Sequence, residues 1–198
     1  MVPKPVFLAQ LDEYRRIADV DEIGRRSLAN NGFDGILTMI GVLMGSLVSG
    51  IRDPHIVLST GLATCMAMGI SGAWGAYMAE SAERKHSLKE LENAMLCDLS
   101  QSKQARAGQF ATIAVAAIDG LAPLVSGTLT ILPFIFSRLV GDIMLTYYLS
   151  LALGMVGLFA LGVFLARVAK ENIIKSGLQM ILAGIVCVIM SVLLNVAS

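Results

Sequence analysis

The stretch PHIVLSTGLATCMAMGISGAWGAYMA, residues 54–79, decides the fold class of this chain. It is 26 residues long and contains no Asp, Glu, Lys or Arg. A helix needs about 20 mainly apolar residues to cross the hydrocarbon core of a bilayer, where only its own hydrogen bonds can satisfy the backbone. The stretch therefore predicts a membrane-spanning helix.

Four further stretches are also apolar and long enough to cross a bilayer. They are residues 27–51, 107–137, 143–166 and 176–198. The composition agrees, since 56% of the 198 residues are hydrophobic and the mean hydropathy is +0.72. The sequence therefore predicts an all-α integral membrane protein with five transmembrane helices in a lipid bilayer, forming one domain over residues 27–198.

The charges predict both the orientation of the chain and the absence of a nucleic-acid partner. Positive residues gather in the segment before the first span, in the connection 80–106 and in the connection after the fourth span, whereas only Arg52 and Arg138 lie on the other side. Because cytoplasmic connections carry excess Lys and Arg, the N-terminus is predicted in the cytoplasm and the C-terminus outside. The formal net charge is zero, and no basic patch remains that this topology does not explain.

Two segments outside the spans are predicted to be helical. Residues 1–26 have the spacing of an amphipathic helix that lies on the cytoplasmic side. The connection 80–106 contains neither proline nor glycine, so the second spanning helix is expected to continue beyond the membrane. In that extension Glu80, Glu83 and Glu90 share a face and are candidates for collecting metal ions, the alternative being an ordinary solvated helix face.

Two aspartates inside predicted spans are the main candidate functional residues. Asp34 and Asp119 each precede a glycine, and an aspartate at the centre of a membrane helix costs about 2.5–3.5 kcal/mol. At helical spacing, the stripe that begins at Asp34 continues through Thr38, Gly41 and Gly45. Since Gly-x-x-x-Gly is typical of close helix packing, we expect the Asp34 carboxylate to face another helix or a polar cavity.

Asp119 lies one turn before Pro123 in the third predicted span. Because proline has no N–H, the Asp119 carbonyl lacks its usual helical hydrogen bond, and carboxylate and carbonyl together suit a cation or a proton. The pattern predicts a metal or proton pathway through these residues. The alternative, for both aspartates, is that each only pins its helix through a neighbouring hydroxyl.

Small residues and methionines of the second span are further candidates. Small residues at helical spacing in this span predict a close helix–helix interface and a candidate dimer seam. They are Gly61, Cys65, Gly69 and Ala73 on one stripe and Gly72, Ala76 and Ala79 on another. The thioethers of Met66 and Met68 can bind soft or borderline metals, although methionine is also an ordinary filler of apolar helices. The three cysteines of the chain are widely spaced and indicate neither a zinc site nor a disulfide framework.

Four segments together resemble the vacuolar iron transporter family. Residues 34–38 (DGILT) are similar to its first helix and residues 71–77 (SGAWGAY) to its second. Residues 117–123 (AIDGLAP) and 175–180 (KSGLQM) resemble its third and fifth helices, so the similarity extends in order over most of residues 25–198.

This resemblance implies a homodimer of five-helix subunits that exports ferrous iron or manganese from the cytosol in exchange for protons. It also implies that Asp34 binds the metal or the proton, and that no cofactor is permanently bound. The family has methionine and glutamate where this chain has Gly72 and Ala76, and its glutamate-rich cytoplasmic domain corresponds here only to residues 80–106.

Two other functions were weighed against transport. A non-transporting relative that serves as a partner or regulatory subunit is favoured by Gly72 and Ala76. A membrane enzyme of phospholipid synthesis is disfavoured, because its Asp-Gly motif needs an alanine-arginine pair and later aspartates where this chain has Pro123 and Leu124. The chain is therefore predicted not to be an enzyme, and it is expected in the plasma membrane of a prokaryote.

Overall fold

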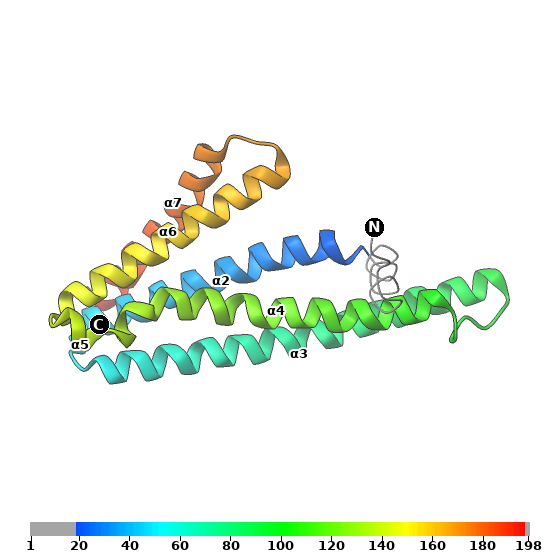
Figure 1. Cartoon of the computed structure of the whole chain (residues 1–198), viewed down its shortest axis with the longest axis horizontal. Helices are drawn as coiled ribbons and strands as arrows, with labels where there is room; N and C mark the ends of the chain where they lie inside the picture. Colours follow the sequence, from blue (N-terminus) through cyan, green and yellow to red (C-terminus); the bar gives the residue numbers. More distant parts are fainter. Residues whose placement is uncertain (1–18, 197–198) are drawn as a thin grey trace, which may run out of the picture. The chain divides into compact units, whose positions relative to one another are not determined.

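The computed structural model describes residues 19–196, which form helices joined by short connections (Figure 1). The helices are α2 (Val20–Val48), α3 (Pro54–Met95), α4 (Lys103–Ile135), α5 (Ser137–Val140), α6 (Ile143–Ala169) and α7 (Ile173–Val196). No strand occurs among these residues, and five of the helices are long and apolar enough to cross a membrane. The predicted fold class and the five predicted spans are confirmed.

The ends of the helices differ from the predicted ends at several places. Helix α2 begins at Val20 and passes residues 26 and 27 without a break, whereas residues 1–18 of the predicted N-terminal helix lie outside the described residues. Helix α3 continues to Met95, as the lack of proline and glycine after Ala79 predicted. Helix α4 ends at Ile135, where the Phe136 N–H bonds to the Pro133 carbonyl in a tightened last turn.

The chain divides into two compact units, and each is described separately here. The described part of the first unit consists of residues 19–28 and Ile70–Leu121. The second unit consists of Ala29–Gly69 and the chain from Ala122 onward. Helices α2, α3 and α4 therefore contribute residues to both units, whereas α6 and α7 belong to the second.

The second unit has the larger apolar core. Met39 and Leu43 of α2 pack there with Phe134 of α4 and Tyr147 of α6. The two aromatic rings meet edge to face with their centroids 5.0 Å apart, a geometry that aromatic pairs favour. The Tyr147 hydroxyl donates a hydrogen bond to the Ile51 carbonyl at 3.0 Å, which attaches α6 to the connection after α2.

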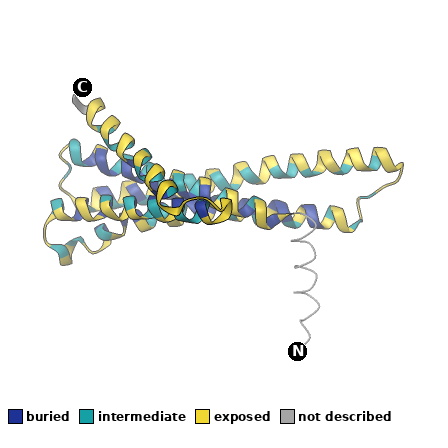
Figure 2. Cartoon of the chain, turned by 90° about the horizontal axis from the view of Figure 1, so that it is seen from above, coloured by how far each residue is buried: buried dark blue, intermediate teal, exposed yellow. Residues whose placement is uncertain are grey.

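The first unit has a small core made by the beginnings of α2 and α4. Val20 packs there against Ala107 and Ala111, and the small alanine side chains allow the helices to approach closely. The same turn of α4 contacts α3, since a Cβ at Gly108 would lie 3.6 Å from the Cβ of Arg84. Exposed residues predominate along the second half of α3 and along α7 (Figure 2).

All three thiols are free, and they differ in exposure. Cys65 is buried in α3, Cys187 is half-buried in α7, and Cys97 is exposed in the connection between α3 and α4. The Cys187 thiol lies 3.7 Å from the Leu37 carbonyl, which brings α7 against α2 in the second unit.

Candidate metal and proton pathway

Asp34 lies on the side of α2 that the chain itself leaves uncovered. Its side chain is exposed, whereas Ile36, Met39 and Ile40 on the other side of the helix are buried in the second unit. No hydrogen bond or ion pair joins the Asp34 carboxylate to another described residue of the chain. Thr38, one turn further along the helix, is half-buried. The carboxylate is therefore available to a cation, a proton or a second protein chain.

The backbone beside Asp34 is fixed by a close contact between α2 and α4. A Cβ added at Gly35 would lie 2.6 Å from the Pro123 carbonyl oxygen and 2.7 Å from the Pro123 Cα, and it would also meet the Ser126 hydroxyl. Real Cβ atoms do not come so close to backbone, so only glycine fits at this position. Sequence analysis missed this role of Gly35, although the Asp-Gly pair drew attention to the position.

The other glycines of the Asp34 stripe make little contact with the chain. A Cβ at Gly41 would touch only the Cys187 sulfur, at 3.9 Å. Gly45 is exposed, and no described atom would lie within 4 Å of its Cβ. Both glycines are therefore open to close packing by something outside this chain.

Asp119 lies in the first unit, in a more enclosed environment. Its side chain is half-buried, and its Oδ1 atom is buried with no hydrogen-bond partner among the described residues. A charged oxygen in that position is costly, because burial removes its hydration without replacing the lost hydrogen bonds. Binding of a proton or of a cation would remove this cost.

The main chain of Asp119 packs against Gly72 of α3. A Cβ at Gly72 would lie only 2.6 Å from the Asp119 carbonyl oxygen and 3.6 Å from the Cα of Gly120. Glycine at this position therefore permits the close approach of α3 to α4 in the first unit. This gives a physical reason for one of the two departures from the family motif, since a methionine at position 72 would collide with the backbone of α4.

Glu80 lies on the same stripe of α3 as Gly72 and Ala76, at intervals of four residues. Its Oε1 accepts a hydrogen bond from the Arg84 Nε at 2.8 Å, and both side chains are largely buried. Glu80 is therefore an ion-pair partner of Arg84 in this structure.

The other two predicted metal-collecting glutamates are solvated. Glu83 is exposed, and Glu90 lies 3.4 Å from the Nε2 of His86, with both side chains about 70% exposed. No three His, Cys, Asp or Glu side chains among the described residues are grouped so that they could hold a metal ion. Among the described residues, Glu80, Glu83 and Glu90 are therefore not grouped as a metal centre, and their role in collecting metal ions stays a prediction.

The methionines and small residues of α3 are divided between its two faces. Met66 is 58% exposed and Met68 is half-buried. Gly61 and Cys65 pack inside the second unit, since a Cβ at Gly61 would meet the Ile131 side chain and one at Gly127 would lie 2.7 Å from the Cys65 sulfur. The predicted close interface is thus found within the chain.

Gly69, on the same face of α3 as Gly61 and Cys65, is also buried. The interpretation of this face as a dimer seam is wrong, because helices of the same chain already cover Gly61 and Cys65.

Comparison with known proteins supports the resemblance seen in the sequence. The VIT family matches residues 26–105, a range that includes Asp34, Gly72 and Glu80. An uncharacterized protein of Methanocaldococcus jannaschii is 28% identical over 179 residues, which cover 89% of this chain and 91% of that protein.

The VIT family is a transporter family. The five apolar helices of the structure agree with a membrane protein. Over residues 26–105, which make up less than half of its length, this chain is similar to the VIT family.

Proposed function

We propose that the chain exports a divalent metal cation, ferrous iron or manganese, from the cytosol in exchange for protons. The observation that carries the proposal is a pair of aspartates within apolar helices whose carboxylates are not fully satisfied by the described residues. Asp34 is uncovered, and Asp119 has a buried oxygen without a hydrogen bond. An ionisable residue at such a position marks an ion or proton pathway.

The proposal includes a homodimer in the plasma membrane of a prokaryote. The uncovered stripe of α2 supports it, because an aspartate in an apolar helix is not stable against lipid alone. Gly41 and Gly45 on the same stripe leave room for the backbone of a second helix to approach. In this arrangement two copies of Asp34 lie near the symmetry axis, where metal ligands from both chains supplement the few that each provides.

Metal flux into proteoliposomes tests this function. Ferrous iron, manganese, cobalt and zinc are offered separately under an imposed pH gradient, with the intact protein and with Asp34→Ala. We expect gradient-dependent uptake of iron or manganese that Asp34→Ala abolishes.

Asp142→Asn is the matched control for this test. Asp142 caps α6 by accepting the Met144 N–H at 2.8 Å, and asparagine caps a helix equally well. Uptake that is the same with and without Asp34, or uptake that ignores the pH gradient, contradicts the proposal.

A second candidate function is a partner or regulatory subunit that has kept the fold without transporting metal. Gly72 and Ala76 favour it, since both replace side chains that can bind metal. The same flux experiment distinguishes the two functions. Folded and correctly inserted protein that moves none of the four ions supports the regulatory function, and the search then turns to protein partners.

A further inference from the structure

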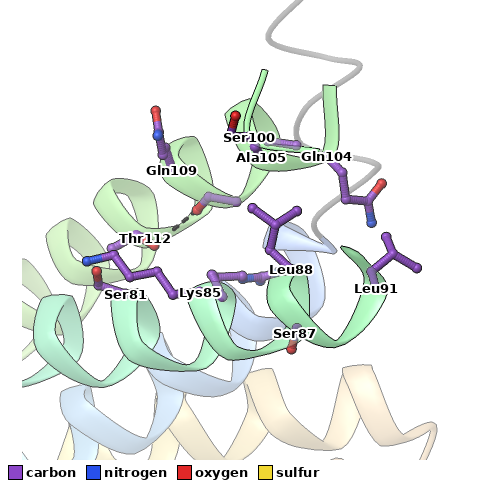
Figure 3. Close-up of a pocket in the computed structure, with 13 residues that line it drawn as sticks. Ser81, Lys85, Ser87, Leu88, Leu91, Ser100, Gln104, Ala105, Gln109 and Thr112 are labelled. Carbon is purple, nitrogen blue, oxygen red and sulfur yellow. Dashed lines mark hydrogen bonds between the residues drawn. The ribbon is translucent and has the colours of Figure 1, made fainter. Parts of the chain in front are cut away.

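A pocket of about 280 Å³ lies within the first unit, between the second half of α3 and the beginning of α4 (Figure 3). Its volume is close to the lower end of the range for small-ligand sites, about 300–1,000 Å³. Apolar walls come from Leu88 and Leu91 of α3, together with Ala105 and Ala107 of α4. The remaining lining is polar or positively charged, so the pocket is not a simple packing defect.

The charged groups of the lining are Arg84 and Lys85, and no carboxylate lines the pocket among the described residues. Glu80 already pairs with Arg84, so Lys85 supplies the net positive charge. No described carboxylate lies within ion-pair distance of the Lys85 ammonium group. A pocket whose exposed Lys85 is not paired with any described carboxylate has the charge expected of an anion site.

Neutral hydrogen-bond donors complete the lining. Ser81 and Ser87 contribute hydroxyls from α3, and Gln104 and Gln109 contribute side-chain amides from α4. These groups donate hydrogen bonds to oxygen atoms without adding negative charge. A phosphate group, with several acceptor oxygens and one negative charge, matches this set of donors better than a metal cation does.

The connection between α3 and α4 is itself held in place by hydrogen bonds. The Leu99 N–H donates to the Glu92 carboxylate at 2.9 Å, and the Ser100 N–H donates to the Asp98 carboxylate at 2.8 Å. The second bond lowers the pKa of the Asp98 carboxyl. Ser100, which lines the pocket, is therefore positioned by the two acidic residues nearest to it, and their negative charges are already bonded to backbone.

The pocket lies at the end of the apolar runs of both helices. Arg84 follows the last residue of the run 54–79 by five positions, and Gly108, which contacts Arg84, is the second residue of the run 107–137. At 1.5 Å per residue, Arg84 lies about 8 Å beyond the apolar run, which is the level of the lipid headgroups. Basic pockets at this level are where anionic headgroups bind.

From this geometry we infer that the pocket binds the phosphate group of an anionic membrane phospholipid, with Lys85 as its cationic contact. The apolar side chains Leu88 and Leu91 face the glycerol part, and the serine and glutamine donors face the phosphate oxygens. The inference does not depend on metal transport, because none of these side chains belongs to the candidate pathway.

Lipid binding to the purified full-length protein tests the inference. Phosphatidylglycerol, phosphatidylcholine or inorganic phosphate is added to the protein in detergent micelles, and two quantities are measured. They are the melting temperature, followed by the fluorescence of the single tryptophan, and the number of lipids retained in native mass spectrometry. We expect phosphatidylglycerol to raise the melting temperature and to stay bound, and we expect the other two probes to do neither.

Two lysine variants make the test specific. Lys85→Gln removes the charge from the pocket, whereas Lys89→Gln removes the same charge from a position of the same helix that does not line it, and both lysines are exposed. We expect Lys85→Gln to weaken phosphatidylglycerol binding about fivefold, since one lysine near an anionic surface contributes about 1 kcal/mol. Lys89→Gln is expected to bind as the unmodified protein does.

Ala105→Leu is a further test variant, because its larger side chain fills the pocket without changing any charge. We expect it to weaken binding at least as much as Lys85→Gln. Equal binding by the unmodified protein and both pocket variants overturns the inference, and so does equal stabilisation by phosphatidylcholine. Stabilisation by inorganic phosphate alone overturns the assignment to a lipid. If Ala105→Leu does not fold, the two lysine variants still decide the result.

Discussion

Asp34-Gly35 in α2 and Asp119-Gly120 in α4 repeat the same two residues, and the chain surrounds them differently. At the first pair the carboxylate is exposed, and the glycine packs tightly on the Pro123 backbone. At the second pair the carboxylate is half-buried with an unbonded oxygen, and the aspartate carbonyl packs on Gly72. The Asp-Gly motif therefore gives the position of the carboxylate along the helix. Whether that carboxylate is exposed or buried depends on the neighbouring helices.

The largest expected effect is on transport and distinguishes the open carboxylate from the enclosed one. We expect Asp34→Asn to lower metal flux at least about a hundredfold, which corresponds to a free-energy barrier to transport that is higher by about 2.7 kcal/mol. An amide cannot bind or release the proton, and it holds a divalent cation weakly. Initial rates in proteoliposomes measure the effect, with Asp142→Asn as control. If Asp119→Asn lowers flux about a hundredfold while Asp34→Asn leaves flux unchanged, the roles of the two residues are reversed.

The second prediction concerns the backbone contact at Asp119. Gly72→Met restores the residue type of the family motif, but it places a Cβ 2.6 Å from the Asp119 carbonyl oxygen. We expect it to lower the free energy of unfolding by about 2–3 kcal/mol, the usual cost of overpacking. Thermal unfolding in detergent measures this change.

Gly75→Met is the matched control for that prediction, because no described atom would lie within 4 Å of its Cβ. A Gly72→Met protein that is as stable as Gly75→Met would mean that α3 and α4 are further apart at this level than the structure shows.

The third prediction compares two glycines of α2. Gly35→Ala is expected to destabilise the fold by about 1–2 kcal/mol, because its methyl group meets the Pro123 backbone. Gly45→Ala has open space and is expected to stabilise α2 slightly, by up to about 1 kcal/mol, through its higher helix propensity. Changes of opposite sign in the free energy of unfolding, measured by thermal unfolding, support this packing. Equal changes for the two variants contradict it.

The smallest expected effect is that of Asp119→Asn on stability. The buried Oδ1 has no hydrogen bond to lose, so an amide of the same size should change the free energy of unfolding by less than about 1 kcal/mol. Chemical or thermal unfolding at fixed pH checks this. A loss as large as that of Gly72→Met would show that Asp119 pins its helix, which is the structural alternative to a pathway role.

Long apolar runs with at most one charged residue were sufficient to predict the five spanning helices, because a bilayer imposes both length and apolarity on each of them. The continuation of α3 to Met95 followed in the same way from the lack of proline and glycine. These features depend on the sequence of one helix alone. The face that each helix turns toward its neighbours depends also on the sequences of those neighbours.

In a soluble helix the apolar face identifies the core, but in a membrane both lipid and protein interior are apolar. The sequence of α2 therefore shows two stripes that look equally suited to packing. The stripe of Asp34 and Gly45 proved to be open, and that of Ile36 and Ile40 proved to be buried. For the same reason, sequence alone did not separate Lys85, which lines a pocket, from Lys89 one turn away.

Because the three thiols differ in exposure, the natural cysteines can report on which side of the membrane one connection of the chain lies. Cys65 and Cys187 lie within apolar helices, where a thiol is protected from aqueous reagents, and Cys97 is exposed in the connection between α3 and α4. A maleimide that cannot cross membranes should therefore label one site. If that connection is cytoplasmic, intact cells resist labelling until they are opened, and the natural sequence reports its own orientation without an added tag or a mutation.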